Sequence, residues 1–273
     1  VLLVHTEQGY GDTILFARFV QQTKLQSQAK VVLEGPVALL PLLRNVAGTD
    51  VVIQAGAGRP KIDFEIPLPG LPGALGIEIQ QLPGPIPYLR APESASAAWR
   101  QHLAQRPATD ATGRVPKKVG IVWTGNPAQN LNALRSCTLA HFARLATIPG
   151  IAWYSLQREA DEQAVAAGWP AGAPSITALG PMLNDFGDTA AVIGALDLVI
   201  SVDTSVAHLA GALGRPVWTL LSHTPDWRWQ LDRADSAWYP TMRLFRQPRW
   251  GDWDSVFEAV APALREFIAV SYG

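Results

Sequence analysis

Short apolar runs rich in valine and isoleucine alternate with helical patterns along most of the chain. In the first part, the runs predict strands at 1–4, 31–33, 51–53 and 64–66, with helices at 13–22 and 36–44. A second series predicts strands at 119–123, 151–156, 198–202 and 216–221, with helices at 188–196, 205–213 and 255–268. Such alternation is typical of an α/β fold whose parallel sheets are covered by helices on both faces.

The two series are separated by a stretch of different character. Residues 105–118 contain two prolines, a glycine and several polar residues and show no apolar period, so we interpret them as a linker. We therefore expect a first domain at 1–105, a second at 116–250 and a final helix within 251–273. Ligands of open parallel sheets bind beyond the carboxyl ends of the strands, so a cleft between the domains is the expected site.

Composition and charge narrow the possible partners. Hydrophobic residues make up 48% of the 273 residues, which is enough for two cores. The net charge of −1 gives no reason to expect nucleic acid or an anionic membrane as a partner, and no apolar run is long enough to span a bilayer. The single Cys137 excludes an internal disulfide and suits a reducing cytoplasm. Because the chain opens on a strand-like run without methionine, we expect it to be part of a longer protein.

Two glycines and an aspartate follow the first predicted strand. The segment Glu7-Gln8-Gly9-Tyr10-Gly11-Asp12 leads into a helix, and Gly9 and Gly11 permit a sharp turn and the close approach of a ligand. Asp12 is a favourable helix N-cap. It is also a carboxylate at the floor of the expected cleft, able to take a proton from a hydroxyl. Both interpretations of Asp12 remain open at this point.

The same segment partly matches a dinucleotide-binding fingerprint. Gly9 and Gly11 are followed, about 20 residues on, by Glu34 at the end of the second predicted strand. Ile14, however, occupies the third glycine position, and Asp12 would place a negative charge beside a pyrophosphate. A nicotinamide-dependent oxidoreductase is therefore the less favoured alternative.

A hydroxyl-rich segment follows the strand predicted at 198–202. Asp203, Thr204 and Ser205 open a helix whose free N–H groups and dipole form an anion site, and His208 lies on the same face as Ser205. The simpler alternative is that Asp203 or Thr204 caps the helix and His208 is a buried, hydrogen-bonded histidine. That alternative does not explain why a polar face coincides with an anion-ready terminus, so we favour a diphosphate site.

Polar residues that follow two other strands of the second domain lie at the same expected edge. Thr124 and Asn126 follow the strand at 119–123, Arg135 lies in the polar stretch beyond them, and Gln157 ends the strand at 151–156. Arginine can bind two phosphate oxygens at once and stays charged. We expect these four residues to join the same anion-binding site, which the resemblance described below makes the donor site.

Two tryptophan-containing segments close the chain. Asp226, Trp227 and Arg228 follow the strand at 216–221 and are candidates for substrate contact, because aromatic faces pack well on sugar rings and bases. The segment 252–254 has the Asp-x-Asp form of metal-dependent glycosyltransferases, but Ser255 and Glu258 after it form a capping box. With no other acidic or histidine cluster at ligand spacing, we expect no metal site.

Together these motifs resemble the heptosyltransferase family, glycosyltransferase family nine. The resemblance rests on the Gly11-Asp12 turn and on Val202-Asp203-Thr204-Ser205-x-x-His208-Leu209. The segments 7–13, 120–127 and 225–229 are most similar to the family-nine-like domains that follow tetratricopeptide repeats in bacterial proteins.

The resemblance implies a GT-B fold, in which two Rossmann-like domains face each other across a cleft and the C-terminal helix packs back on the first domain. It implies an inverting glycosyltransferase with a nucleoside-diphosphate sugar donor and no metal or other cofactor. Asp12 would be the base, and Arg135, Asp203, Thr204, Ser205 and His208 would line the diphosphate. Two departures are that the family's lysine appears as Arg135 and a frequent glycine as Ser205. The resemblance does not determine whether the acceptor is a glycan, a lipid or a protein. The alternative to an enzyme is a non-catalytic module that binds a nucleotide sugar.

Overall fold

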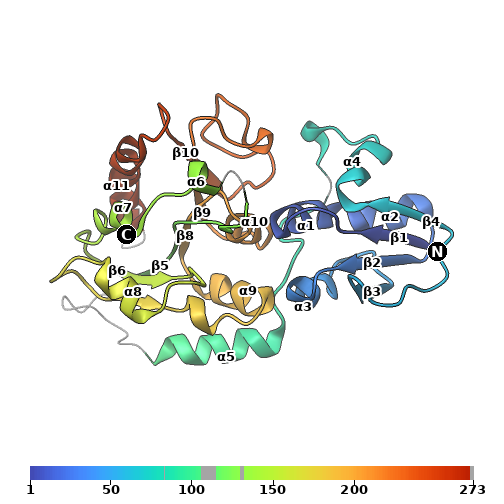
Figure 1. Ribbon diagram of the computed structural model, residues 1–273, viewed down its shortest axis with the longest axis horizontal. Coiled ribbons are helices and arrows are strands. Elements are labelled where there is room, and N and C mark those ends of the chain that lie inside the picture. Colours follow the sequence, from blue (N-terminus) through green and yellow to red (C-terminus); the bar gives the residue numbers. More distant parts are fainter. Residues whose placement is uncertain (83, 106–114, 130–131, 271–273) are drawn as a thin grey trace.

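Two parallel sheets form the centre of the computed structural model, which describes residues 1–82, 84–105, 115–129 and 132–270 (Figure 1). The first sheet has the order β3-β2-β1-β4 and the second the order β10-β9-β8-β5-β6-β7. The first sheet comprises β1 (Leu2–His5), β2 (Val31–Gly35), β3 (Val51–Gln54) and β4 (Phe64–Pro67). The second comprises β5 (Lys117–Val122), β6 (Ile151–Ser155), β7 (Ile176–Ala178), β8 (Leu198–Val202), β9 (Val217–Leu221) and β10 (Met242–Arg246). All pairings between these strands are parallel, so the α/β prediction is confirmed.

Helices cover the two sheets. In the first part of the chain these are α1 (Tyr10–Phe16), α2 (Val20–Ser27), α3 (Leu40–Leu43), α4 (Leu71–Ala74) and α5 (Glu93–Ala104). The second part contributes α6 (Asn132–Arg135), α7 (Leu139–Ala143), α8 (Glu162–Ala167), α9 (Phe186–Ala195), α10 (Ser205–Ala212) and α11 (Trp253–Val270). The predicted helix at 13–22 is in fact two helices joined by a 3₁₀ turn, and the first of them begins earlier, at Tyr10.

The central strand β8 shows why these runs form strands. All five of its residues are buried, and an uninterrupted apolar strand fits a parallel sheet that is covered on both faces. It lies between β5 and β9, with Ile121 opposite Ile200 and Val202 opposite Leu220. The carboxyl ends of β5, β8 and β9 therefore meet at one edge of the second sheet.

The two halves of the chain meet through α1 and α10, which pack directly against each other (Figure 1). Gly11 makes this approach possible, because a Cβ atom at that position would lie 2.9 Å from Cδ2 of His208. One hydrophobic cluster continues across the contact, from Val4 and Ile14 to Leu209 and Ala210. The packing of α1 on α10 thus fixes the loop before α1 relative to the start of α10.

The packing of helix α5 does not follow the predicted domain boundary. Although it lies within 1–105, it packs along α9 of the second half, and the indole N–H of Trp99 donates to the Asp188 carboxylate at 3.0 Å. The central part of the predicted linker, 106–114, lies outside the described residues. Lys117 and Lys118, which the prediction placed in the linker, already belong to β5.

The final helix α11 also differs from the expectation. It runs continuously through Pro262, but it packs on α7 and β10 of the second half rather than on the first domain. Val256, Phe257, Val260 and Leu264 are buried in the core cluster of the second sheet. The expected return to the first domain is wrong, because the apolar face of α11 already finds its partner beside the second sheet.

Candidate functional site

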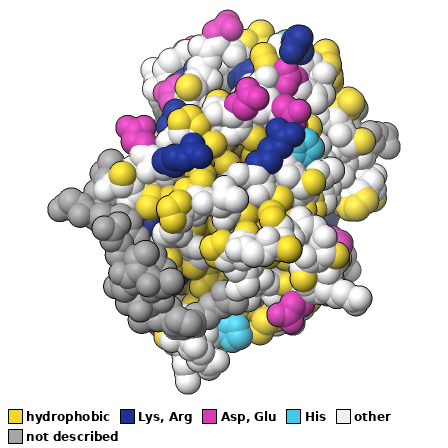
Figure 2. All heavy atoms as spheres, turned by 90° about the vertical axis from the view of Figure 1, so that its left-hand side faces the viewer, with side chains coloured by type: hydrophobic (Ala, Val, Ile, Leu, Met, Phe, Trp, Pro, Cys, Tyr) yellow, Lys and Arg dark blue, Asp and Glu magenta, His cyan; other side chains and the backbone are white. Residues whose placement is uncertain are grey.

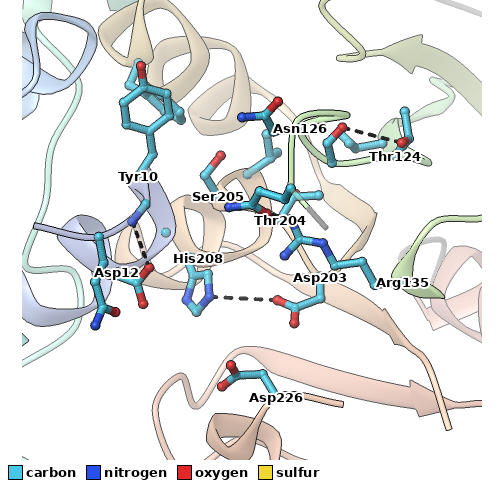
Figure 3. A pocket seen from close by; sticks show the side chains of 18 of the residues that line it. Tyr10, Asp12, Thr124, Asn126, Arg135, Asp203, Thr204, Ser205, His208 and Asp226 are labelled. Atoms are coloured by element: carbon cyan, nitrogen blue, oxygen red, sulfur yellow. Dashed lines mark hydrogen bonds and ion pairs between the residues drawn. The ribbon is translucent and has the colours of Figure 1, made fainter. Parts of the chain in front are cut away.

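A cavity of about 740 Å³ lies between the two sheets, where the loops after their strands meet. Its walls come from the segments that follow β1, β5, β6, β8 and β9. Figure 3 shows residues from both halves grouped around one space. All the site residues predicted from the sequence line it: Gly9, Gly11, Asp12, Thr124, Asn126, Arg135, Gln157, Asp203, Thr204, Ser205, His208, Asp226, Trp227 and Arg228.

Asp12 is the third residue of α1 rather than its N-cap. The N-cap is Gly9, and the carboxylate of Asp12 accepts a hydrogen bond from the Gly9 backbone N–H at 3.1 Å (Figure 3). The prediction that Asp12 is the N-cap is therefore wrong, although its side chain does bind a backbone group at the start of the helix. This bond uses Oδ2 and leaves Oδ1 to face the second domain.

The other carboxylate oxygen of Asp12 forms an ion pair with Arg228, which follows β9. The Arg228 guanidinium also pairs with Asp226 at 2.7 Å and lies over the rings of Trp227 and Phe16. Only 10% of the Arg228 side chain is exposed. A cation held this firmly fixes the orientation of Asp12 across the boundary between the two halves.

The start of α10 is open to an anion. Its N-cap, Thr204, makes no side-chain hydrogen bond to the first turn, because the Thr204 hydroxyl pairs with Ser201 at 2.9 Å. The hydroxyl of Ser205 has no partner among the described residues and lines the cavity. Thr204 is therefore the N-cap by position, as the simpler alternative has it, but its side chain does not cap the helix. The other half of that alternative, a buried and hydrogen-bonded His208, is confirmed. The backbone N–H groups of this turn remain available at the positive end of the helix.

His208 is buried, and the pKa of its imidazole is lowered to about 3 by burial and by the charges of Arg228 and Arg135. Its Nδ1 lies 3.0 Å from the Tyr239 hydroxyl. Tyr88 donates its own O–H to the Ile14 carbonyl at 3.1 Å and also lies 3.5 Å from the Tyr239 hydroxyl. The lowered pKa keeps the imidazole neutral, and donation from the Tyr239 O–H to Nδ1 would place its proton on Nε2.

Asp203 lies on the Nε2 side of His208, and its Oδ1 is 3.9 Å from the His208 Nε2 atom (Figure 3). This separation is too long for a hydrogen bond. Burial raises the pKa of Asp203, while Trp229 and Arg135 oppose the rise. Nε2–H and the Asp203 carboxyl together form a polar pair that a ligand hydroxyl in the cavity can bridge.

The polar residues after β5 and β6 form a connected group. The Thr124 N–H donates to the Gln157 side-chain oxygen at 3.2 Å, and the Thr124 hydroxyl contacts Ser136 at 3.0 Å. Asn126 closes a turn by accepting from the Ala128 N–H at 3.0 Å. Thr124 and Gln157 therefore shape the wall, since their side chains are already bonded within the protein.

Arg135 lines the cavity beside Asp203 and Thr204, at the start of α10 (Figure 3). One of its terminal nitrogens donates to Gln129, and its buried Nε has no hydrogen-bond partner. The guanidinium also lowers the pKa of both Asp203 and His208, which shows that its charge reaches them. An oxyanion bound at the start of α10 would lie within the field of Arg135.

Several lining residues were not singled out from the sequence. Tyr10 and Phe186 come from opposite halves and meet edge to face at 5.1 Å between ring centroids. Gln8, Gln129 and Glu159 also line the cavity. Phe186 begins α9, and no strand-end or glycine signal marks its position, so only the three-dimensional arrangement reveals it.

The segment 252–254 acts as a helix start, as expected, but through a different residue pair. Asp252 accepts from the Ser255 N–H at 3.1 Å directly before α11, so the predicted box of Ser255 and Glu258 is wrong. Asp254 pairs with Arg144 at 2.8 Å. Among the described residues, no group of three His, Cys, Asp or Glu side chains could hold a metal ion.

Glu34 does not reach the cavity. Its buried carboxylate pairs with Arg59 at 2.6 Å, and a second bond from Arg59 Nε is 3.2 Å long. In a dinucleotide site this carboxylate would bind the ribose. The arrangement disfavours the nicotinamide alternative.

Charged side chains on one face of the molecule are mixed in sign. On the face shown in Figure 2, acidic and basic side chains are intermixed rather than gathered by sign, so this face presents no basic stripe of the kind that binds nucleic acid. No helix in the described part of the chain is both long and apolar enough to cross a membrane.

Comparison with known proteins places these features in a family context. Residues 151–250 match the family model described as "Glycosyltransferase family 9 (heptosyltransferase)". The chain is 27% identical over 290 residues to "Protein FlbA" of Caulobacter vibrioides, an alignment that covers 98% of this chain and 47% of that protein. The chain thus spans about half the length of this curated relative.

Solved structures share the fold over the whole chain. "E. coli ADP-heptose lps heptosyltransferase II" matches with a TM-score of 0.70 and 14% identity, covering 100% of this chain and 99% of that one. A glycosyltransferase family 9 protein from Veillonella parvula matches with a TM-score of 0.68 and 12% identity, covering 98% and 97%. The E. coli heptosyltransferase WaaC, solved with ADP-2-deoxy-2-fluoro heptose, matches with a TM-score of 0.59 and 15% identity, covering 99% and 100%.

At these identities the structures establish the fold, which is the GT-B arrangement of the heptosyltransferases, as predicted. The predicted resemblance to the heptosyltransferases of glycosyltransferase family nine is therefore confirmed, by sequence in residues 151–250 and by fold over the whole chain.

Proposed function

We propose that this chain is an inverting glycosyltransferase that moves a sugar from a nucleoside-diphosphate donor, held by the second domain, to an acceptor hydroxyl beside the first. The observation that carries the proposal is a single cavity that joins the open start of α10 and Arg135 on one side with Asp12 on the other. These are the two kinds of group that such a transfer needs: donors for a departing diphosphate and a base for the acceptor.

In this proposal the donor diphosphate binds at the start of α10. The backbone N–H groups of the first turn, the Ser205 hydroxyl and the Arg135 guanidinium supply the positive end of the site. Thr204 contributes through its backbone, because its hydroxyl is bonded to Ser201. The bridging pair of His208 Nε2–H and Asp203 then faces the sugar hydroxyls, while Gln157 and Thr124 shape the wall near the nucleoside.

The reaction would proceed by attack of the acceptor oxygen on the anomeric carbon. Asp12 takes the acceptor proton, the bond between the anomeric carbon and the phosphate oxygen breaks, and its electron pair leaves with the diphosphate. Negative charge grows on the leaving group, so donors held in place beforehand at α10 and Arg135 lower the barrier. No residue in this scheme requires a bound metal.

The donor to test first is ADP-heptose, because related structures of the same fold are described with that sugar nucleotide or its analogue. A panel of nucleoside-diphosphate sugars, with NAD as the oxidoreductase control, would be scored by thermal shift and then by release of the nucleoside diphosphate. We expect stabilisation and release with one sugar nucleotide, and none with NAD. A panel without any stabilising sugar nucleotide would contradict the proposal.

A non-catalytic nucleotide-sugar-binding module is the second candidate. It is favoured by one observation: both oxygens of Asp12 already have partners, Gly9 and Arg228. Each carboxylate oxygen has a second lone pair, so these bonds alone do not prevent proton transfer. Binding of a sugar nucleotide without transfer to water or to any acceptor would favour the binding module.

Because this chain matches only 47% of its curated relative, we propose further segments in the full protein, with tetratricopeptide repeats upstream and a cytoplasmic location. Sequencing of the complete reading frame and fractionation of cells would test both points.

A further inference from the structure

A second cavity, of about 310 Å³, opens beside the candidate site on the side of the first domain. Eleven of the described residues line it, and nine of these are apolar, including Phe16, Ile77, Ile79, Trp227 and Trp238. The two polar members are Gln8 and Arg228, which together with Trp227 also line the larger cavity. The two spaces therefore share a wall.

The shared wall contains Arg228, the residue that orients Asp12. Arg228 forms the ion pair with Asp12 and faces both cavities. A molecule that presents a hydroxyl to Asp12 can therefore extend past Arg228 into the second cavity. The donor groups at the start of α10 lie in the larger cavity only, so the second cavity belongs to the acceptor side.

The lining excludes some kinds of acceptor. A sugar that filled this space would lose water from its hydroxyls, and among the described lining residues Gln8 and Arg228 alone have polar side chains to replace it, which is unfavourable. The Arg228 charge is already balanced by Asp12 and Asp226. A phosphate or carboxylate of a lipid headgroup or acidic glycan would therefore find no free cation among the described lining residues.

Size and surface favour a short apolar group. The cavity holds one or two large side chains and is small for the chain of a membrane lipid. The aromatic side chains of Phe16, Phe19, Trp227 and Trp238 line it, and aromatic lining is also found in grooves that bind peptides. Trp227 is 61% exposed, so the cavity is open to solvent on its side.

We infer that the second cavity is a subsite for an apolar side chain of a peptide acceptor, whose nearby serine or threonine hydroxyl is presented to Asp12. The inference rests on the proposed function and adds the acceptor class to it. It makes a leucine- or phenylalanine-sized residue near the modified hydroxyl the main determinant of acceptor choice.

The test uses the donor selected by the sugar-nucleotide panel, carrying a labelled sugar. The probes are synthetic glycine–alanine peptides with one serine or threonine, with or without a leucine or phenylalanine within about three residues of it. We expect about tenfold or more label in the peptides with the apolar residue, the usual discrimination of an apolar pocket. Ile77→Ser and Ile79→Ser should each remove most of this preference, whereas Leu25→Ser, at an exposed position outside both cavities, should keep it.

Unchanged donor affinity by calorimetry and unchanged melting temperature would show that the Ile77 and Ile79 variants are folded and that their donor site is intact. Equal labelling of peptides with and without the apolar residue would overturn the inference. Labelling of octyl-chain lipids or oligosaccharides in place of peptides would also overturn the inference. The same holds if the donor binds but no peptide is labelled. If no donor binds, the proposed function fails first, and fluorescence polarisation of the same peptides then decides the inference separately.

Discussion

At the scale of single residues, Asp12 is held by one partner from each half of the chain. The Gly9 N–H fixes Oδ2 and the Arg228 guanidinium fixes Oδ1. A base that is oriented before the substrate arrives loses little freedom in the reaction. The same two contacts make Asp12 part of the local structure, so the roles of base and helix-start residue coexist in one side chain.

Replacing Asp12 by asparagine separates these roles. The amide oxygen of Asp12→Asn can still accept the Gly9 N–H bond, but the side chain can no longer take a proton. We expect donor binding to be retained and the melting temperature to fall, because the variant loses the ion pair with Arg228, while sugar transfer falls by about 10²–10⁴-fold. Transfer would be followed by release of the nucleoside diphosphate.

Glu7 supplies the matched control, because it lies on the same loop but does not line the cavity. Glu7→Gln should transfer at the rate of the unmodified chain. A near-normal rate in Asp12→Asn would show that Asp12 is only structural, and loss of folding in that variant would make its structural role the dominant one.

His208 predicts how stability depends on pH. Its folded pKa of about 3 lies well below the ordinary value of 6.5 in an unfolded chain, so between these values the unfolded state binds a proton that the folded state does not. Stability is therefore greatest above pH 6.5 and falls as the pH drops toward 3. This one group should lower the free energy of unfolding by about 2 kcal/mol at pH 5 relative to pH 8.

The comparison variant is His208→Gln, which does not titrate. Urea unfolding at pH 8 and pH 5 should show a smaller loss for the variant, by about 2 kcal/mol. The raised pKa of Asp203 acts in the opposite direction as the pH falls, but it is present in both proteins and largely cancels in the difference. Equal losses in the two proteins would mean that the buried imidazole is protonated in the fold.

At the scale of elements, apolar period and turn chemistry were sufficient to predict most of the two sheets. β8 was predicted with its observed bounds, and α10 differed from its prediction only at its last residue. Strand-end polar residues were likewise predictable as neighbours, because the carboxyl ends of parallel strands share one edge. Thr124, Gln157 and Asp203 reach one cavity for that reason.

The sequence did not allow us to predict which helix packs on which sheet or helix. The apolar face of α11 is evident from its sequence, but the sequence pattern does not say which sheet it covers. Helix α5 packs on α9, and its short apolar face around Trp99 and Leu103 gave too weak a period to be recognised. The ion pair between Asp12 and Arg228 joins positions that lie 216 residues apart, a pairing that depends wholly on the folded chain.

The contact between α1 and α10 gives a prediction at this scale. In Gly11→Ala the added Cβ would lie 2.9 Å from Cδ2 of His208, whose ring is held by Tyr239 and cannot move easily. Alanine favours a helix by about 0.5–1 kcal/mol, but overpacking costs about 1–3 kcal/mol. We expect a net loss of about 1 kcal/mol in the free energy of unfolding, measured in urea.

Gly194 in α9 is the matched control, because a Cβ there meets nothing within 4 Å. Gly194→Ala should be stabilising by the helix-propensity difference alone. If Gly11→Ala were stabilised to the same extent, the two helices would not be in close contact in solution.

At the scale of the whole molecule, the site exists only because two sheets present their carboxyl ends to each other. The first sheet supplies Asp12, the second supplies Arg135 and the start of α10, and the packing of α1 on α10 fixes their separation. Neither half contains all of these groups. The donor should therefore bind chiefly to the second half, and the first half should complete the site for the acceptor.

The most direct test is calorimetric titration of the chain with ADP-heptose and with ADP. We expect one site per chain for both ligands. Arg135→Ala should weaken both by about 1–3 kcal/mol, the usual loss of a hydrogen bond to a charged group, and Arg144→Ala, an exposed arginine that pairs with Asp254, should change neither. Absence of binding by either nucleotide, or equal affinity in Arg135→Ala and the unmodified chain, would contradict a diphosphate site at the start of α10.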